Sequence, residues 1–223
     1  MKAGNQTYRD IDDIPAVIPV FPLSGALLLP GTQMPLNLFE PRYLAMFDAA
    51  LAGNRMIGMI QPSYTEDHSN PEKPKLCKVG CLGRIVTFSE TGDGRYIITL
   101  QGIARFRVLE ELASATPFRQ CRIAPFATDL ADNDDGEDVN REALLEAFRN
   151  YLSANELEAD WESVEKAANG PLVNALSVMS PYGPAEKQAL LEADTIKARA
   201  ETLIAITEMS LARDSDDFKQ TLQ

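Results

Sequence analysis

The feature that most constrains the fold is the stretch from Val17 to Ala52, in which prolines punctuate short apolar runs. Proline has no backbone N–H and is tolerated in a sheet only at selected positions, so these runs are predicted to be short edge or barrel strands. From Met34 to Phe39, apolar residues alternate with other residues, which is typical of a half-buried strand. A helix is predicted from Pro41 onward, because proline suits the first helical turn and an apolar face follows it.

Further strands are predicted downstream. The apolar run from Met56 to Gln61 predicts a buried strand. The glycines of the turn from Thr91 to Gly94 permit positive φ, so the flanking segments 82–89 and 95–100 are predicted to pair as a hairpin. With two more segments near 104–108 and 118–124, about six short strands precede residue 125, as a small closed or nearly closed barrel requires.

The net charge of −12 is unevenly distributed along the chain. Residues 1–122 carry 13 Lys/Arg against 12 Asp/Glu, whereas residues 123–223 carry 8 against 21. This shift indicates two modules with different surfaces. The predicted fold class is α+β, with a small six-stranded β-barrel followed by a helical bundle. We predict a mobile arm over 1–14, the barrel over 15–125, an acidic linker over 126–140, a helical subdomain over 141–213 and an acidic tail over 214–223.

Three segments in this order carry a family resemblance. They are FEPRY (Phe39 to Tyr43), preceded by FPL and LLLPG; VGCLGRIVTFSETGDGRYIITLQGIARFRV (Val79 to Val108); and EKQALLEADTIKARAETLIAI (Glu186 to Ile206). Together they resemble the amino-terminal, substrate-binding domain of Lon proteases over most of the chain. The resemblance implies a barrel of the PUA-like type (pseudouridine synthase and archaeosine transglycosylase) and a module that recognises substrates and supports oligomers.

The predicted function is therefore non-catalytic protein or peptide binding, with an unfolded or partner polypeptide as the bound species. A full Lon protease adds ATPase and peptidase domains, but the sequence has no GxxxxGK[ST] loop to hold phosphates and no length left for a further domain. We expect no enzyme activity and no cofactor. The oligomeric state, and whether the protein acts with a Lon protease, are left open.

The sequence also bears on location. No apolar run is long enough to span a bilayer, so no membrane association is expected. The amino-terminal residues are acidic where a signal peptide needs an apolar core, which predicts a cytoplasmic protein. Three cysteines, an odd number in a chain of 223 residues, do not suggest a disulfide framework.

Methionines and aromatic residues of the first module are the candidate contacts for a bound peptide. Most of them are expected in the core. Any that are exposed would form an adaptable apolar surface, because methionine is flexible and polarizable. The candidates are Met34, Phe39, Met56, Met59 and Tyr64.

An alternative function is RNA binding through an arginine-rich sheet face, since PUA-like barrels also occur in RNA-binding proteins. The candidate arginines can equally form a solvated face or pair with acidic groups. Nucleic acid is disfavoured, because stacking aromatics are not interleaved with these arginines and the second half of the chain is acidic. The arginines are Arg84, Arg105, Arg107, Arg119 and Arg122.

His68 is the only histidine, so a Ser-His or Cys-His nucleophile would depend on one residue in a predicted loop. His68, Cys77 and Cys81 could be three zinc ligands, but the CxxxC spacing has no second pair and no fourth ligand is evident. We therefore predict no catalytic and no metal site, and assign the two cysteines to the core.

Overall fold

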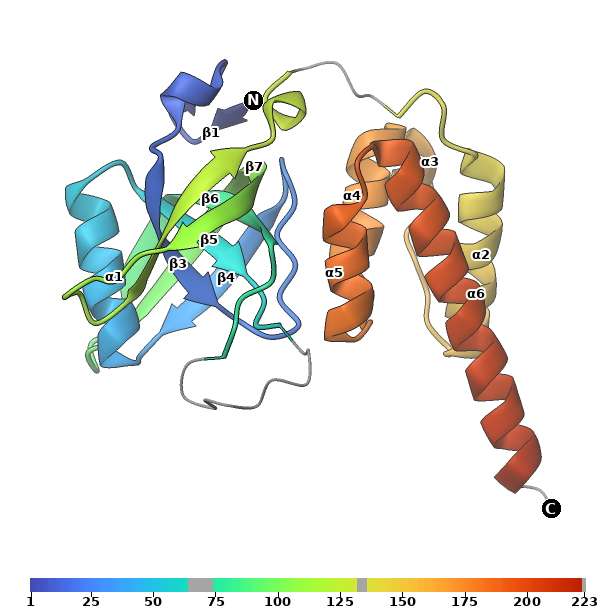
Figure 1. Ribbon diagram of the computed structural model, residues 1–223. Coiled ribbons are helices and arrows are strands. Elements are labelled where there is room, and N and C mark those ends of the chain that lie inside the picture. The colour runs from blue at the N-terminus through green and yellow to red at the C-terminus, as the bar shows by residue number, and fades with distance from the viewer. Residues whose placement is uncertain (64–73, 132–135, 222–223) are drawn as a thin grey trace. The chain divides into compact units, whose positions relative to one another are not determined.

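The structure is a computed structural model that describes residues 1–63, 74–131 and 136–221, with side chains up to residue 213. The chain divides into two compact units, whose elements are labelled in Figure 1. Unit 1 comprises Met1–Asp132 and Tyr182–Leu191, and unit 2 comprises Asn133–Pro181 and Glu192–Gln223. The chain therefore passes from one unit to the other three times.

The main sheet of unit 1 has six strands in the order β4-β7-β6-β5-β3-β8. The additional pairing of β7 with β8 curls the sheet into a barrel that is not strictly closed. The predicted α+β class is confirmed. The strands are β3 (Val17–Pro22), β4 (Gln33–Leu38), β5 (Met56–Ile60), β6 (Val79–Glu90), β7 (Tyr96–Glu111) and β8 (Arg119–Pro125).

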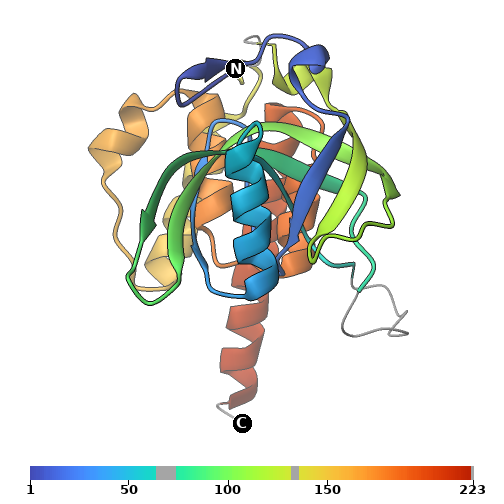
Figure 2. The same ribbon diagram turned by 90° about the vertical axis from the view of Figure 1, so that its left-hand side faces the viewer.

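Shorter elements complete unit 1. A small two-stranded sheet precedes the barrel, and the helix α1 lies against the strands in both views (Figures 1 and 2). These elements are β1 (Lys2–Ala3), β2 (Gln6–Thr7), the 3-10 helix η1 (Ile11–Asp13), α1 (Pro41–Ala52), the 3-10 helix η2 (Ala127–Asp129) and α5 (Pro184–Glu192).

The predicted alternation is confirmed in β4. Its residues Leu36 and Leu38 lie opposite Ile98 and Tyr96 of β7. In the described part of the chain β4 pairs with β7 alone and is an edge strand, which is where a sheet tolerates Pro35.

The barrel core is packed closely enough to require glycine at particular positions. A Cβ at Gly80 would lie 2.5 Å from the ring of Phe106, which is fully buried. At Gly102 a Cβ would lie 2.1 Å from the carbonyl oxygen of Leu29. The backbones are held together there, since Gly102 N donates to Thr32 O at 2.9 Å and Gly31 N donates to Gly102 O at 3.0 Å.

The amino-terminal residues are packed against the barrel, so the predicted mobile arm over 1–14 is wrong. Ala3 and Tyr8 are buried in the barrel core cluster. The Met1 ammonium group donates to the carbonyl oxygens of Tyr8 at 3.1 Å and Leu130 at 3.2 Å. The polar composition of the segment misled the prediction, because a few buried side chains suffice to anchor a short hairpin.

The first part of the predicted linker, 126–131, also belongs to the barrel. Leu130 is buried, and Asp129 forms a bidentate ion pair with Arg105. Arg105 Nε and Nη2 donate to Asp129 Oδ2 and Oδ1 at 2.8 and 2.7 Å, and the Arg105 backbone N–H donates to Oδ2 at 2.8 Å. Residues 132–135 of the predicted linker lie outside the described residues.

Helix α5 packs on the barrel, although the sequence places it among the helices of the second module. The buried Gln61 side chain accepts from Gly25 N at 2.9 Å and donates to Pro184 O at 3.0 Å. At the other end of the helix, Arg105 Nη1 donates to Leu191 O at 3.3 Å. The predicted continuous helical subdomain over 141–213 is therefore interrupted by a helix that belongs to unit 1.

The described residues of unit 2 form four helices. Asn140 caps the first of them by accepting from Ala143 N, and Arg141 Nη2 donates to Val164 O at 2.7 Å, which ties α2 to α3. The last helix continues through most of the residues predicted as a tail, 214–223. The helices are α2 (Arg141–Ala154), α3 (Trp161–Lys166), α4 (Asn169–Met179) and α6 (Ile196–Thr221). None of the helices in the described residues combines the length and apolar character needed to cross a membrane.

Candidate polypeptide-binding surface

Three large apolar side chains are exposed near the ends of neighbouring strands in unit 1. Phe39 is 59% exposed, and Phe88 and Ile97 are each 50% exposed. They lie at the end of β4, in β6 and in β7, which are adjacent in the sheet. Phe39 and Ile97 lie on one face of the sheet, because Ile97 pairs with Asn37, two residues before Phe39, whereas Phe88 pairs with Ile98 on the other face. We call Phe39 and Ile97 the hairpin-end patch.

Strand pairing explains why these side chains are exposed. Ile97 pairs with Asn37 on the face opposite to the buried Ile98, and Phe39 lies two residues beyond Asn37. Phe88 pairs with the buried Ile98 and therefore lies on the inner face, near the strand end, where its ring contacts Phe47 of α1. Its ring centroid is 5.6 Å from that of Phe47, and Figure 2 shows α1 beside the β6–β7 hairpin.

Polar contacts fix the turn that borders the patch. Thr91 Oγ1 donates to Asp93, and this hydrogen bond, more than the nearby Arg95 guanidinium, lowers the pKa of the Asp93 carboxyl. Arg95 Nε lies 3.2 Å from Asp93 Oδ2, and its guanidinium carbon is 5.9 Å from the centroid of the Phe39 ring. The hydrogen bond from Tyr96 to Glu90 raises the pKa of the Tyr96 hydroxyl. The patch is thus an apolar surface with a charged, ordered border.

The sequence candidates for peptide contact are not brought together. Phe39 is exposed and Met34 is half-buried opposite Leu100. Met56 and Met59 are buried in β5, so their assignment to a binding surface is wrong. Their run is apolar throughout and was itself predicted to be a buried strand, and methionine's flexibility does not imply exposure. Tyr64 lies outside the described residues.

The sequence analysis missed Ile97. The signal was present, because the turn from Thr91 to Gly94 fixes the hairpin register. Alternation along β7 then places Ile97 and Ile98 on opposite faces. An apolar residue on each face at a strand end implies that one of them meets solvent.

The candidate arginines do not form a free basic stripe. The Arg105 side chain is 3% exposed and forms an ion pair with Asp129. Arg119 forms a bidentate pair with Glu111 at 2.6 and 2.9 Å, and Arg122 lies 3.7 Å from Glu110. Arg84 donates to Tyr8 and Asn54. Arg107 is exposed and lies over the Phe126 ring at 5.7 Å.

The structure does not test the chemistry considered around His68. His68 itself lies outside the described residues. Cys81 is buried and its Sγ contacts Leu82 O at 3.8 Å, while the half-buried Cys77 contacts Pro62 O at 3.7 Å. No group of three or more His, Cys, Asp or Glu able to hold a metal ion occurs in the described ranges.

Comparison with known proteins identifies the family of the chain. It belongs to the family described as the ATP-dependent protease La (LON) substrate-binding domain, whose model matches residues 17–208. The resemblance predicted from the sequence is confirmed. The match is to the substrate-binding domain, not to catalytic domains.

Curated relatives agree with this assignment. The chain is 29% identical over 203 residues to Lon protease from Anaeromyxobacter dehalogenans, covering 87% of this chain and 23% of that protein. It is 30% identical over 206 residues to Lon protease from Parabacteroides distasonis, covering 88% and 24%. The chain therefore spans about a quarter of the length of the curated relatives it matches.

Two solved structures share the fold. A Lon N-terminal domain protein from Xanthomonas campestris matches with a TM-score of 0.62 and 22% identity, over 85% of this chain and 97% of that one. The N-terminal domain of Mycobacterium avium complex Lon protease matches with a TM-score of 0.63 and 18% identity, over 86% and 98%. At these identities the likeness supports the fold alone.

Proposed function

We propose that this protein binds apolar segments of unfolded or partner polypeptides through the hairpin-end patch, and that it catalyses no reaction. The observation that carries the proposal is the exposure of Phe39 and Ile97 on the same face at the ends of the adjacent strands β4 and β7. Single exposed apolar residues are ordinary, but neighbouring ones bordered by charged groups are typical of interaction sites. Membership of a family described as substrate-binding supports a polypeptide as the ligand.

The strand beside the patch offers a second recognition element. Among the described strands β4 is an edge, so its outward backbone groups can pair with an extended segment. Pro35 lacks an N–H and removes one donor from this edge, which disfavours long strand addition. Apolar contacts with the patch would then contribute most of the affinity.

RNA binding is the weaker alternative. Phosphate contacts need arginines whose charge is available, and Arg105, Arg119 and Arg122 already face carboxylates. A cytoplasmic location remains a prediction from the sequence.

The binding site can be tested on the full chain with the double variant Phe39→Ser, Ile97→Ser. The probe is a fluorescently labelled, permanently unfolded protein, reduced and carboxymethylated α-lactalbumin, followed by anisotropy at two salt concentrations. We expect wild-type binding that salt hardly changes, because apolar contacts are not screened. The double variant should bind roughly tenfold more weakly, the loss expected from removing about 1.4 kcal/mol of apolar contact.

The matched control is Leu109→Ser, since Leu109 is 59% exposed on β7 outside the patch. Its affinity should equal that of the wild type. Equal weakening in the control and the double variant would show that the patch is not the site. RNA retention at low salt that disappears at moderate salt would favour the alternative function instead.

The non-catalytic part of the proposal has its own test. The purified protein should neither hydrolyse ATP nor degrade casein, because its sequence has no GxxxxGK[ST] loop to bind the phosphates. Phosphate release and peptide release are measured against a buffer control. Turnover that co-purifies with the chain through successive columns would contradict the expectation.

A further inference from the structure

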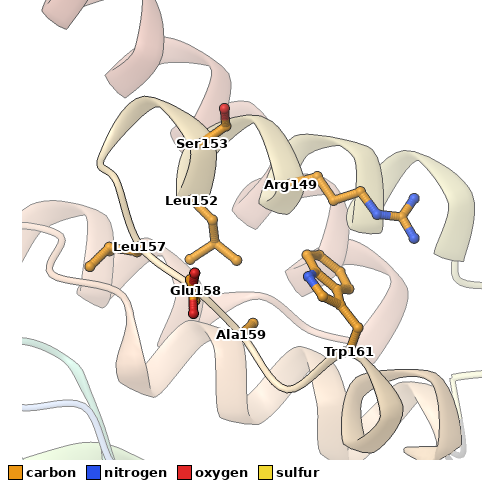
Figure 3. A pocket seen from close by; sticks show the side chains of 7 residues that line it. All are labelled: Arg149, Leu152, Ser153, Leu157, Glu158, Ala159 and Trp161. Carbon is orange, nitrogen blue, oxygen red and sulfur yellow. The ribbon is translucent and has the colours of Figure 1, made fainter.

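Unit 2 contains a hollow of about 720 Å³ that the function proposed for unit 1 does not use. It lies between the carboxy-terminal half of α2 and the segment that leads from α2 into α3 (Figure 3). We call it the α2 hollow. Its volume is in the range of sites that accept a small ligand or a few side chains. The lining residues are Arg149, Leu152, Ser153, Leu157, Glu158, Ala159 and Trp161.

The walls of the hollow combine the apolar side chains of Leu152, Leu157 and Trp161 with the polar ones of Arg149, Ser153 and Glu158. Leu152 is buried and points from α2 toward the opposing segment, while Leu157 is 52% exposed (Figure 3). Trp161 is half-buried, with the Phe148 ring centroid 6.2 Å from its own and the Arg149 guanidinium 4.8 Å from its ring. The Trp161 ring, which Phe148 and Arg149 contact, and the half-exposed Leu157 leave apolar surface in contact with water. Covering this surface with an apolar group is therefore favourable.

The chain around the hollow is net acidic. From residue 149 to residue 166 it has five acids against two bases, Arg149, which lines the hollow, and Lys166. Two of the acids are engaged within α3. Asp160 accepts from Ser163 N at 3.2 Å and Ser163 Oγ at 2.5 Å, and these hydrogen bonds lower the pKa of its carboxyl, while Glu162 pairs with Lys166 at 2.5 Å. Glu158 is exposed and lines the hollow itself.

We propose that the α2 hollow binds an apolar side chain of a polypeptide segment in which lysine or arginine flanks that side chain. The apolar group would cover Leu157 and Trp161, and the flanking cations would face Glu158 and its acidic neighbours. Charge complementarity selects this occupant, because an acidic segment would be repelled by the same acidic residues. The inference rests on the proposed function, polypeptide binding, and assigns a second binding site for the polypeptide to unit 2.

Trp161 gives a direct readout, because it is the only tryptophan in the chain. The probe is a short unstructured Gly/Ser peptide with a central Lys-Leu-Leu-Lys and no aromatic residue. Titrated into the full chain, it should shift Trp161 emission to shorter wavelength, saturably, as the leucines exclude water from the indole. A peptide with central Glu-Leu-Leu-Glu should give no shift at the same concentrations.

Two variants test the contacts. Leu157→Ser should weaken the response roughly tenfold, since an exposed leucine that becomes buried contributes about that factor. Glu158→Lys should weaken the Lys peptide about threefold at low salt and strengthen the Glu peptide, as expected for an exposed charge pair. Leu109→Ser, equally exposed but in unit 1, is the control and should respond like the wild type.

The outcomes separate this inference from the proposed function. The inference is supported if Trp161 emission shifts with the Lys peptide but not with the Glu peptide, and if Leu157→Ser weakens that response. If the emission spectrum does not change, while the labelled unfolded protein still binds in a way that needs Phe39 and Ile97, the inference alone is overturned. If the unfolded protein binds neither unit, both are overturned. Equal responses to the Lys and Glu peptides would overturn the assignment of a cationic partner.

Discussion

Replacing Arg105 by alanine is expected to destabilise unit 1 by about 3–5 kcal/mol. The substitution leaves Asp129, whose side chain is 8% exposed, buried beside β7 without its counter-charge. It also removes the hydrogen bond to Leu191 O that holds the end of α5. The effect is measured by urea unfolding, with hydrogen exchange of β7 amides reporting unit 1 and Trp161 fluorescence reporting unit 2.

Arg107→Ala is the matched control, because Arg107 lies two residues along the same strand and is exposed. Its loss should cost less than about 1 kcal/mol. The double variant Arg105→Met, Asp129→Leu should be much less destabilised than either single variant, since it leaves no buried charge unpaired. Equal stabilities for Arg105→Ala and Arg107→Ala would show that the buried pair does not hold the barrel and η2 together.

Gly102→Ala is expected to destabilise unit 1 by about 3 kcal/mol or more. The new methyl group would meet the Leu29 carbonyl oxygen at 2.1 Å and its carbon at 2.8 Å. The backbone cannot withdraw easily, because two hydrogen bonds join Gly102 to Gly31 and Thr32. Thermal unfolding of the variant, followed by far-ultraviolet circular dichroism, measures the loss.

Gly53→Ala provides the control for this substitution. Gly53 has φ −108°, and a Cβ there would meet its nearest atom, the Ala49 carbonyl oxygen, at 3.5 Å. This is ordinary van der Waals contact, so the variant should unfold within about 0.5 kcal/mol of the wild type. A Gly102→Ala protein as stable as Gly53→Ala would mean that the segment containing Leu29 can move away from the barrel.

Local patterns in the sequence predicted the barrel well. The alternation before Pro41 and the glycine turn after Thr91 fix strands through short-range backbone preferences, which act on a few adjacent residues. Arg105 lies on the outer side of its strand, since Ala104 and Phe106 point inward. The sequence left open whether this face is solvated or paired with acidic groups, and it could not name Asp129 as the partner of Arg105. The cover comes from η2 and α5, and the second of these lies more than seventy residues downstream.

Helix α5 shows why that cover could not be predicted. Pro184 is at the first position of the helix, where proline is favoured, and Leu190 and Leu191 are buried as an apolar face requires. Periodicity shows that a helix has an apolar face, but it does not show which unit that face packs against. The deciding contacts are single hydrogen bonds from Gln61 and Arg105 to helix carbonyls, and these leave no repeat in the sequence.

The late position of α5 constrains how a nascent chain can fold on the ribosome. All six barrel strands emerge early, yet Gln61 and Arg105 lack their partners in α5 until Tyr182–Leu191 have been synthesised. By then the residues of three helices of unit 2, α2 to α4, have already been synthesised. The last packing step of the amino-terminal unit therefore follows most of the carboxy-terminal unit in time, and the order of folding cannot simply follow the order of the chain.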